Sequence, residues 1–405
     1  MSAVITNERG IALVITLLVV ALLTITVVEF TYSVEVDQHM ARNALSGLQA
    51  SLLARSGINL GEAFLLHDDD PRVDAFTEEW CPQPGTDGYT CQIDGTNSSL
   101  VVPDNMRFRV QIIDEGGKLN INMVRFRTRA QWVRWRDSQD GDPQRQVQPL
   151  ESWKMALAHL LEGRGADPEI ADLVLEYWDS VYQAQYPGAV GNSPSGSGGD
   201  ARAGATPSPR PQAAEPQFQQ LDFPSLDDVG VIAGFTPSLI RRLRPVLTAL
   251  PGNQLRVNAN TAPREVLQAI VGDEEVVSNI ISQRSETPLR QADLVGLIRN
   301  LNQASSDTRN YAGAMLGVTS FYYRVRASAK VNPNPVTGRG GIGRSASMLV
   351  RRIRRSARRT GASAVPWSLT QLDWQKEGGA RLFREQRGGD AGDQSQDLRG
   401  LGSRG

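Results

Sequence analysis

The chain has 405 residues, of which 40% are hydrophobic, so it is long enough for two or three packed units and is neither fully disordered nor fibrous. Its 43 basic and 44 acidic residues give a formal net charge of −1 at pH 7. Because these charges nearly cancel, no overall field favours nucleic acid or an acidic substrate, and any partner has to be recognised locally.

The first predicted element is a membrane-spanning helix. Residues 11–28 carry no charge, and as a helix they would extend about 27 Å, nearly the thickness of a bilayer core. A cleaved secretory peptide is the alternative, but its apolar region is usually shorter and a small-x-small site would follow, whereas residues 27–30 read Val-Val-Glu-Phe. Arg9 precedes the span while Glu29 and Asp37 follow its apolar core, so we predict a span over 11–30 with the bulk of the chain outside the cytoplasm.

A short polar leader, residues 1–10, ends in Gly10 and runs directly into the apolar segment that starts at Ile11. This layout resembles the leader of type IV prepilin-like proteins, whose membrane peptidase cuts after the glycine and methylates the new N-terminus. The resemblance implies cleavage after Gly10 and methylation of Ile11. Most members carry a glutamate at the fifth mature position, where this chain has Ile15, and that departure is similar to the K-type minor pseudopilin of type II secretion systems. The alternative is an ordinary anchor with a chance glycine before it.

Beyond the span the helical pattern continues, because Ala41, Leu45, Leu48 and Leu52 recur at the spacing of one helix stripe. The helix is expected to cover 11–66 and to end near Asp68-Asp69-Asp70-Pro71, since proline excludes its predecessor from helical geometry. One helix of that length, half in lipid and half packed on a soluble domain, is the architecture of pilins.

The two cysteines, Cys81 and Cys91, lie ten positions apart around prolines and glycines that can bend the chain back on itself. We predict a disulfide, which would persist only in an oxidising compartment such as the periplasm. Two unpaired thiols are the alternative.

Alternating patterns predict a split sheet. Residues 108–112 and 119–122 flank the glycine turn 114–118 and predict a β-hairpin in the region 67–150, the first part of an α/β domain. A second strand pair, 321–328 with 348–350, falls in the region 306–355. The pattern between them, over 151–305, is helical. The predicted fold is therefore α+β, with a long N-terminal helix on a small antiparallel sheet and a large helical insertion between strands. The K-type pseudopilin has this split sheet, and residues 114–122 resemble its sequence.

Within the insertion, 188–214 is rich in Gly, Ser, Pro and Ala and predicts a flexible surface loop. Two helix starts follow, at Thr236-Pro237 and at Thr261-Ala262-Pro263, where a threonine can cap free amides. Residues 257–262 resemble both the K-type pseudopilin and the helix-hairpin-helix modules of DNA-uptake proteins. The tail 356–405 is expected to be largely disordered.

The sequence gives little support for an enzymatic function. The histidines His39, His67 and His159 have no partners at metal-ligand spacing, and no nucleophile motif or phosphate-binding loop is present. Asp114-Glu115 is interpreted as turn chemistry. The arginines between 351 and 359 are the best candidates for nucleic-acid contact, but without interleaved aromatic residues they are interpreted as a solvated strand end.

Resemblance to the K subunit also implies a calcium site built from acidic residues of the insertion. The candidates here are Glu176, Asp179, Asp200 and Asp222. Calcium prefers six to eight oxygens including several carboxylates, so this sparse set makes calcium a possible ligand and no more.

The resulting hypothesis is a non-catalytic minor pseudopilin that caps the pseudopilus tip and supports protein export. It implies as partners the I- and J-type minor pseudopilins, the prepilin peptidase, the inner-membrane secretion platform and membrane lipid, with no nucleic acid. The protein would cross the inner membrane once and place its C-terminal domain in the periplasm. The alternative is a membrane-anchored helix-hairpin-helix protein that binds DNA.

Overall fold

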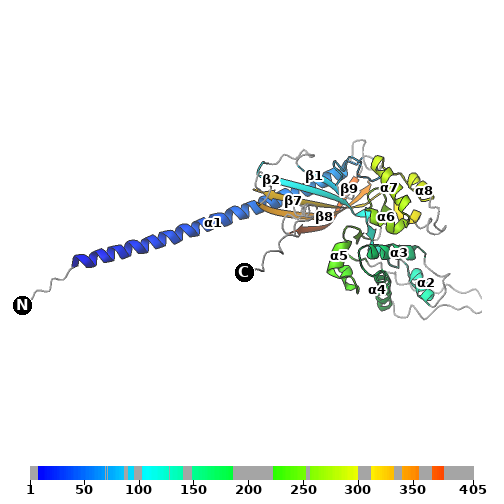
Figure 1. Ribbon diagram of the computed structural model, residues 1–405, viewed down its shortest axis with the longest axis horizontal. Helices are drawn as coiled ribbons and strands as arrows, with labels where there is room; N and C mark the ends of the chain where they lie inside the picture. The colour runs from blue at the N-terminus through cyan, green and yellow to red at the C-terminus, as the bar shows by residue number, and fades with distance from the viewer. Residues whose placement is uncertain are drawn as a thin grey trace, which may run out of the picture.

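The computed structural model describes eight helices in the parts of the chain 8–68, 70, 72–85, 90–94, 103–126, 128–139, 148–185, 222–251, 256–299, 312–332, 340–354 and 367–377. The helices are α1 Glu8–Leu66, α2 Arg129–Gln139, α3 Gln148–Gly163, α4 Ile170–Gln185, α5 Pro237–Leu243, α6 Arg264–Val271, α7 Glu274–Glu286 and α8 Gln291–Arg299. The strands are β1 Thr90–Asp94, β2 Met106–Asp114, β3 Leu119–Asn120, β4 Leu247–Thr248, β5 Val257–Asn258, β6 Leu316–Gly317, β7 Tyr322–Val331, β8 Ile342–Arg354 and β9 Trp367–Glu377. Figure 1 shows α1 projecting far from a sheet and a group of shorter helices.

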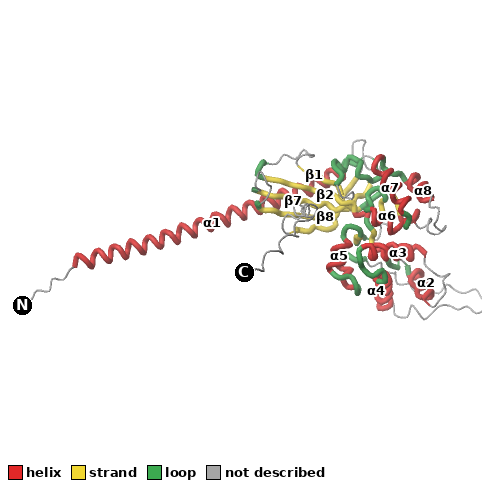
Figure 2. The backbone as a smooth tube through the Cα atoms, in the orientation of Figure 1, coloured by secondary structure: helices red, strands yellow, loops and turns green. Residues whose placement is uncertain are grey.

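The main sheet is antiparallel and has the strand order β1-β2-β7-β8-β9. Strands β2 and β7 are neighbours in register, with Val110 opposite Ala327, although helices α2 to α8 lie between them in the sequence. Figure 2 shows these helices gathered at the end of the sheet that lies away from the free end of α1. The predicted α+β fold, with a long helix on a sheet split by a helical insertion, is confirmed.

The second half of α1 packs directly on one face of the sheet. A Cβ atom on Gly57 would lie 2.9 Å from Ala327 Cβ, and one on Gly61 would lie 2.5 Å from Val325 Cγ1. The two glycines therefore permit an approach of helix to sheet that no larger residue allows. Ile58 and Leu65 complete this face and are fully buried against the sheet.

A second and larger core fills the helical insertion. Each helix buries an apolar side toward this core, through residues such as Trp132, Leu157, Val174 and Leu267. Two short parallel strand pairs, β3 with β4 and β5 with β6, connect the chain next to the main sheet with the insertion. The insertion is consequently a packed unit of its own, joined to the sheet at one end.

The predicted hairpin between 108–112 and 119–122 is wrong. Strand β2 pairs with β1 and β7, and Leu119 pairs in parallel with Leu247 of the insertion. The residues between them form a 3-10 turn, Glu115–Gly117, in which the Asp114 carboxylate accepts a hydrogen bond from Gly116 N. The glycines therefore end strand β2 and redirect the chain into the insertion.

The tail was also predicted incorrectly in part, because β9 lies within the segment expected to be disordered. It pairs with β8 from Ser345 opposite Glu377 to Arg354 opposite Trp367, with a register shift at Leu349/Val350. Leu369 packs against the sheet core, which gives this polar strand an apolar contact. The predicted loop 188–214 lies outside the described residues, as does the rest of the tail.

Candidate functional site

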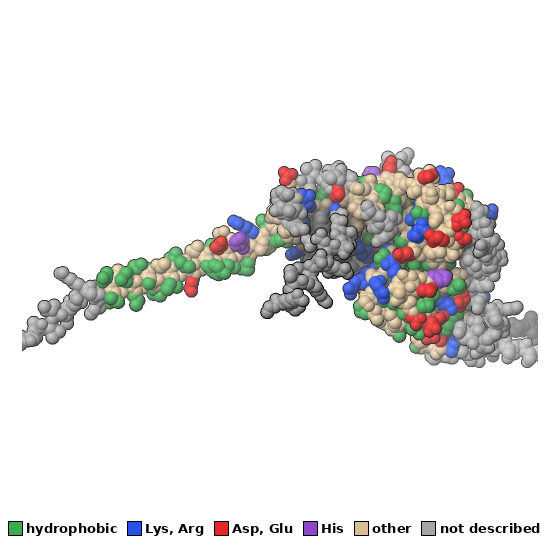
Figure 3. All heavy atoms as spheres, in the orientation of Figure 1, with side chains coloured by type: hydrophobic (Ala, Val, Ile, Leu, Met, Phe, Trp, Pro, Cys, Tyr) green, Lys and Arg blue, Asp and Glu red, His purple; other side chains and the backbone are tan. Residues whose placement is uncertain are grey.

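The free half of α1 is an apolar helix without neighbours among the described residues. Its side chains are mostly 46–64% exposed between Leu13 and Val28, and it is long and apolar enough to cross a membrane. Figure 3 shows these side chains in green, followed by charged groups before the helix reaches the sheet. The hydroxyls of Thr16, Thr24 and Thr26 donate to the backbone carbonyls four residues earlier. This pairing satisfies the threonines within the helix, as hydrocarbon surroundings require.

The residues expected to govern processing and position lie at the beginning of this helix. The backbone of Gly10 and Ile11 is helical within α1. Ile15 lies one turn further on and is 57% exposed. Cleavage and methylation remain predictions.

The half of α1 that packs on the sheet has two apolar faces. Ala50, Ala54 and Ile58 are buried against the sheet, whereas Leu45 and Leu48 are each 57% exposed. At about 100° per residue the exposed residues lie nearly opposite the buried ones. We name the exposed set the leucine stripe; it consists of Leu45, Leu48 and Leu52, the last also 57% exposed. The stripe is thus available to a second helix while α1 stays on its own sheet.

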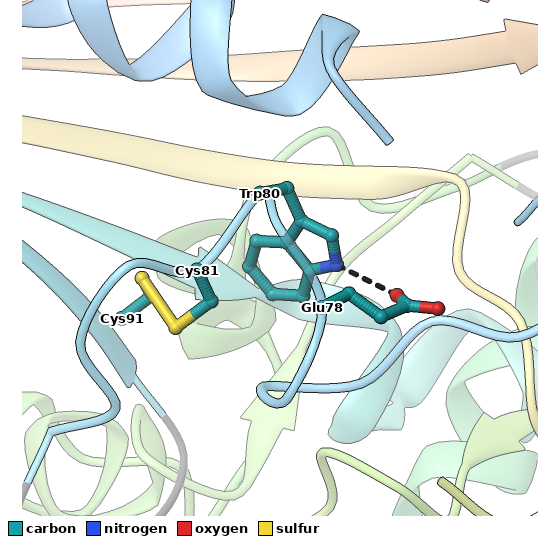
Figure 4. Close-up of a disulfide and its surroundings, with 4 residues drawn as sticks. All are labelled: Glu78, Trp80, Cys81 and Cys91. Atoms are coloured by element: carbon teal, nitrogen blue, oxygen red, sulfur yellow. Dashed lines mark hydrogen bonds between the residues drawn. A yellow bond between two sulfur atoms is a disulfide. The ribbon is translucent and has the colours of Figure 1, made fainter. Parts of the chain in front are cut away.

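A disulfide joins Cys81 and Cys91, whose Cα atoms are 5.4 Å apart, a usual separation for this bond. Cys91 lies on β1 and is fully buried, and the bond adjoins the buried ring of Trp80 (Figure 4). Closing a loop of this length is expected to restrict the unfolded chain by roughly 3 kcal/mol in the entropy account.

Beside Trp80, a buried arginine pairs with two of three neighbouring carboxylates. Arg352 on β8 is fully buried and forms ion pairs with Asp68, at 2.8 Å, and with Asp74. Asp74 also accepts hydrogen bonds from Tyr323 Oη, at 2.9 Å, and from Ser320 N. The network ties the end of α1 and the loop that follows it to the two central strands β7 and β8.

The carboxylates of Asp68, Asp74 and Glu78 each offer an oxygen within 4.8 Å of the others, a spacing that would suit a metal ion. Arg352 occupies the position of the cation, however, since its guanidinium pairs with two of the three. A metal ion placed beside that guanidinium would be repelled. The donor set therefore fits an internal ion network and does not fit a metal centre.

Glu78 has an unusual protonation equilibrium in this network. Burial, together with the negative charges of Asp68 and Asp70, raises its pKa from the ordinary 4.5 to about 8. Its Oε2 accepts hydrogen bonds from Ala75 N and Trp80 Nε1, both at 2.9 Å, and the latter is drawn in Figure 4. These two bonds favour the charged form but do not offset the desolvation.

We expect Glu78→Gln to stabilise the protein at the upper end of this pH range. Between the unfolded and folded pKa values the folded protein binds one proton more than the unfolded chain, so stability falls as the pH rises from about 4.5 to about 8. The variant lacks the titrating carboxyl group, so its free energy of unfolding should decrease less as the pH rises. Urea unfolding at about pH 5 and about pH 8 measures the effect.

Glu79→Gln is the matched control, because Glu79 is the exposed neighbour. A pH profile that changes equally in both variants would contradict the assignment to Glu78.

A second buried network centres on Asp114 at the end of β2. Its Oδ2 accepts hydrogen bonds from Thr261 Oγ1 at 2.5 Å, Ser320 Oγ at 2.6 Å and Asn258 Nδ2 at 3.1 Å. Burial nonetheless raises the pKa of Asp114 above its ordinary value. Turn formation is therefore one part of its role, and connecting the sheet to the insertion is the other.

This network shows which role the motif at 257–262 has in the fold. Asn258, Asn260 and Thr261 are all at least 97% buried, so these side chains are not available to a DNA backbone. Thr236 caps α5 as predicted, by accepting from Leu239 N, whereas Thr261 donates to Asp114 and does not cap α6. Arg352, one of the arginines interpreted as solvated, is also buried. Among the described residues, the motif at 257–262 and Arg352 thus have internal roles.

Two of the calcium candidates are engaged by other groups. Asp179 accepts from Trp132 Nε1 at 2.6 Å and lies 3.5 Å from Arg136 Nε, and Asp222 pairs with Arg125 at 2.8 Å. Glu176 is exposed on α4. Asp200 lies outside the described residues. Within the described part of the chain these carboxylates do not form a group of three with ligand atoms in mutual reach.

The comparisons with known proteins concern the fold. No protein-family model matches the chain, and no curated protein matches its sequence. A chain in the crystal structure of the GspK-GspI-GspJ complex from the enterotoxigenic Escherichia coli type 2 secretion system superposes with a TM-score of 0.52 and 16% identity. The superposition covers 84% of this chain and 99% of that chain. At this identity the likeness establishes a shared fold.

Proposed function

We propose that this chain is a K-type minor pseudopilin of a type II secretion system, acting as a structural part of the pseudopilus and without catalysis. The observation that carries the proposal is the helical unit inserted between neighbouring strands β2 and β7 of a sheet packed on a partly free α1. The shared fold with a chain of the GspK-GspI-GspJ complex supports the same conclusion.

The proposed insertion and maturation of the chain take place at the inner membrane. The span 11–30 anchors the chain once, prepilin peptidase removes residues 1–10 after Gly10, and Ile11 becomes the methylated N-terminus. Everything beyond the span lies in the periplasm, where an oxidising environment maintains the bond between Cys81 and Cys91. Before assembly, the subunit contacts the lipid of the inner membrane and the inner-membrane secretion platform.

Ile15 supports a place at the tip. In the pilin-like family, a glutamate at this position is thought to pair with the N-terminal amine of the subunit above it. Placing an unpaired carboxylate in hydrocarbon costs a few kcal/mol of free energy. An opposite charge at ~4 Å attracts that carboxylate by roughly 4 kcal/mol at an effective dielectric near 20. A subunit with Ile15 has no carboxylate to satisfy and therefore needs no subunit above it. The insertion would also obstruct a subunit stacked on top.

We therefore expect this subunit only at the apex of the filament. Gold labelling of the periplasmic domain on over-assembled pseudopili measures the position directly. Label at one end of each filament is the expected result. Label distributed along the shaft would contradict the tip position.

The leucine stripe is the proposed contact for the I- and J-type minor pseudopilins. It continues the line of exposed apolar residues that begins in the membrane span, and it lies opposite the face that holds the sheet. Helices of neighbouring subunits can thus pack along α1 from the bilayer into the periplasm without disturbing the fold.

Leu48→Glu should reduce co-purification of these partners at least tenfold, about the loss expected when a buried leucine is replaced by a charge. Asn43→Glu is the matched control, because Asn43 is exposed on the same part of α1 but lies on the opposite side from the stripe. Equal retention of partners by both variants would show that the stripe is not the contact.

A further inference from the structure

The helical insertion has a cleft on its surface that the proposed function does not use. The cleft has a volume of about 550 Å³ and lies between the C-terminal end of α3 and helix α6, which Figure 1 shows beside each other. This volume is within the range of roughly 300–1,000 Å³ that ligand-binding clefts have in proteins. A cleft of this size has room for one long side chain of another molecule.

Contacts between the two helices fix the shape of the cleft. His159 Nδ1 on α3 donates to the backbone oxygen of Ala269 on α6, at 3.2 Å. Arg164, which follows the end of α3, pairs with Glu265 of α6. Leu160 and Ala269 are buried and give the cleft an apolar wall. The fold of the insertion therefore forms the cleft by itself.

The α3 side of the cleft offers unused hydrogen-bond acceptors. Glu162 is exposed, and within the described part of the chain its carboxylate forms no ion pair or hydrogen bond. His159 precedes it by three positions, so the two side chains are neighbours on the helix surface. Because His159 Nδ1 carries the proton that Ala269 O accepts, Nε2 of the neutral ring is also an acceptor. These groups fit an occupant that donates hydrogen bonds.

The charges around the cleft favour a cation over an anion. Two arginines line it, but each already has an acidic partner: Arg164 pairs with Glu265, and Arg264 pairs with Glu274. Glu162 is the carboxylate left over among the charged residues that line the cleft. It also lies in the last turn of α3, where the partial negative charge of a helix C-terminus favours cations.

An arginine side chain has the required combination of properties. Its guanidinium is positively charged, carries five N–H donors and can bind a carboxylate through two parallel hydrogen bonds. Its aliphatic stem can lie along the apolar wall at Leu160 and Ala269 while the guanidinium contacts Glu162. Among the described residues, the acidic and histidine side chains of the cleft do not bring three ligand atoms within 4.8 Å of one another. An arginine therefore fits the cleft better than a metal ion does.

We propose that this cleft binds an arginine side chain on an exposed segment of a partner protein. Figure 2 shows the insertion at the end of the sheet that lies away from the free end of α1, so a protein that is not packed along α1 can reach it. The inference uses only the insertion and does not rest on the proposed function.

The test uses the full chain in a non-ionic detergent with isotope-labelled alanine methyl groups. The probe is a short acetylated peptide of glycine and serine around one central arginine. Methyl NMR should show a shift of the Ala269 signal that saturates as peptide is added, since this methyl group lines the cleft. The same peptide with citrulline keeps the shape of arginine without its charge, and it should bind about fivefold more weakly or not at all.

Two variants with matched controls examine charge and space separately. Glu162→Gln removes the unpaired carboxylate and should weaken peptide binding about fivefold. Its control is Glu169→Gln, an exposed position that does not line the cleft, which should change binding less than about twofold. Gly163→Phe adds a side chain to the lining, where a Cβ atom has no neighbour within 4 Å, and should weaken binding at least as much. Gly296→Phe on α8, at an equally open position, is its control.

Peptide binding that neither variant weakens beyond its control would overturn the proposal, as would a peptide without effect on the Ala269 signal. Tighter binding of an acidic peptide would overturn it too, because the occupant would then be an anion. A short diamine that binds more tightly than the arginine peptide would assign the cleft to a small amine instead of a partner protein. Peptide binding requires no filament, so its failure is distinguishable from a failure of pseudopilus assembly.

Discussion

Gly10→Val should leave the leader of this protein uncut. The proposed peptidase requires a small residue before the cleaved bond, and valine adds a branched side chain at that position. The parent protein, purified from membranes, should have an intact mass that lacks residues 1–10 and includes one methyl group on Ile11. The variant should retain the mass of the whole chain, and secretion that depends on this subunit should be lost.

Ala3→Val provides the control, since it adds comparable bulk within the leader but away from the cleaved bond. Normal processing of the Gly10→Val protein would remove the assignment to the pilin-like pathway. An unprocessed parent chain would do the same.

Arg352→Met should destabilise the folded part of the chain, the sheet with the helices packed on it, by about 3–5 kcal/mol. Removing the arginine leaves Asp68 and Asp74 buried without a cation, and breaking one partner of a buried ion pair costs about this much. Burial lowers the pKa of Arg352 to about 10, and Asp68 opposes this effect, so the arginine remains charged at neutral pH. Urea unfolding followed by tryptophan fluorescence measures the loss.

Arg351→Met is the natural comparison, because Arg351 is the adjacent residue on the opposite face of β8 and is only half-buried. It should cost less than about 1 kcal/mol. Combining Arg352→Met with Asp68→Asn and Asp74→Asn should recover much of the stability, since the uncompensated charges are gone. An Arg352→Met protein as stable as the parent would show that the network is not needed.

The sequence was sufficient for features that depend on neighbouring residues. The length of α1 followed from its apolar run and from the proline at position 71, and the threonine cap of α5 followed from Thr236-Pro237. The location of the insertion followed from strand patterns on either side of a long helical region. In each case the residues that give the prediction lie close in the sequence to the element that they predict.

The error at Asp114 concerns a residue whose partners are distant in the sequence. The sequence around Asp114 indicates only a turn. Its contacts with Thr261 and Ser320 could not be predicted, because these residues are 147 and 206 positions away. The pairing of β9 depends on a neighbouring strand and not on its own polar sequence. Arg352 could have been found, since it has the same inward phase as Met348 and Val350 on β8.

The split of the sheet also has a consequence for the order of folding. Asn105 and Asn332, at the ends of β2 and β7, are hydrogen-bonded although they are 227 positions apart, so the central strand pair closes a very long loop. Contacts of such separation form late, because the entropy of loop closure has to be overcome first. In the proposed setting, β2 leaves the translocation channel long before β7, so the edge of β2 that pairs with β7 lacks its partner until the whole insertion has crossed. A nascent chain with this split sheet therefore passes through a prolonged stage with an unpaired strand edge, which favours aggregation.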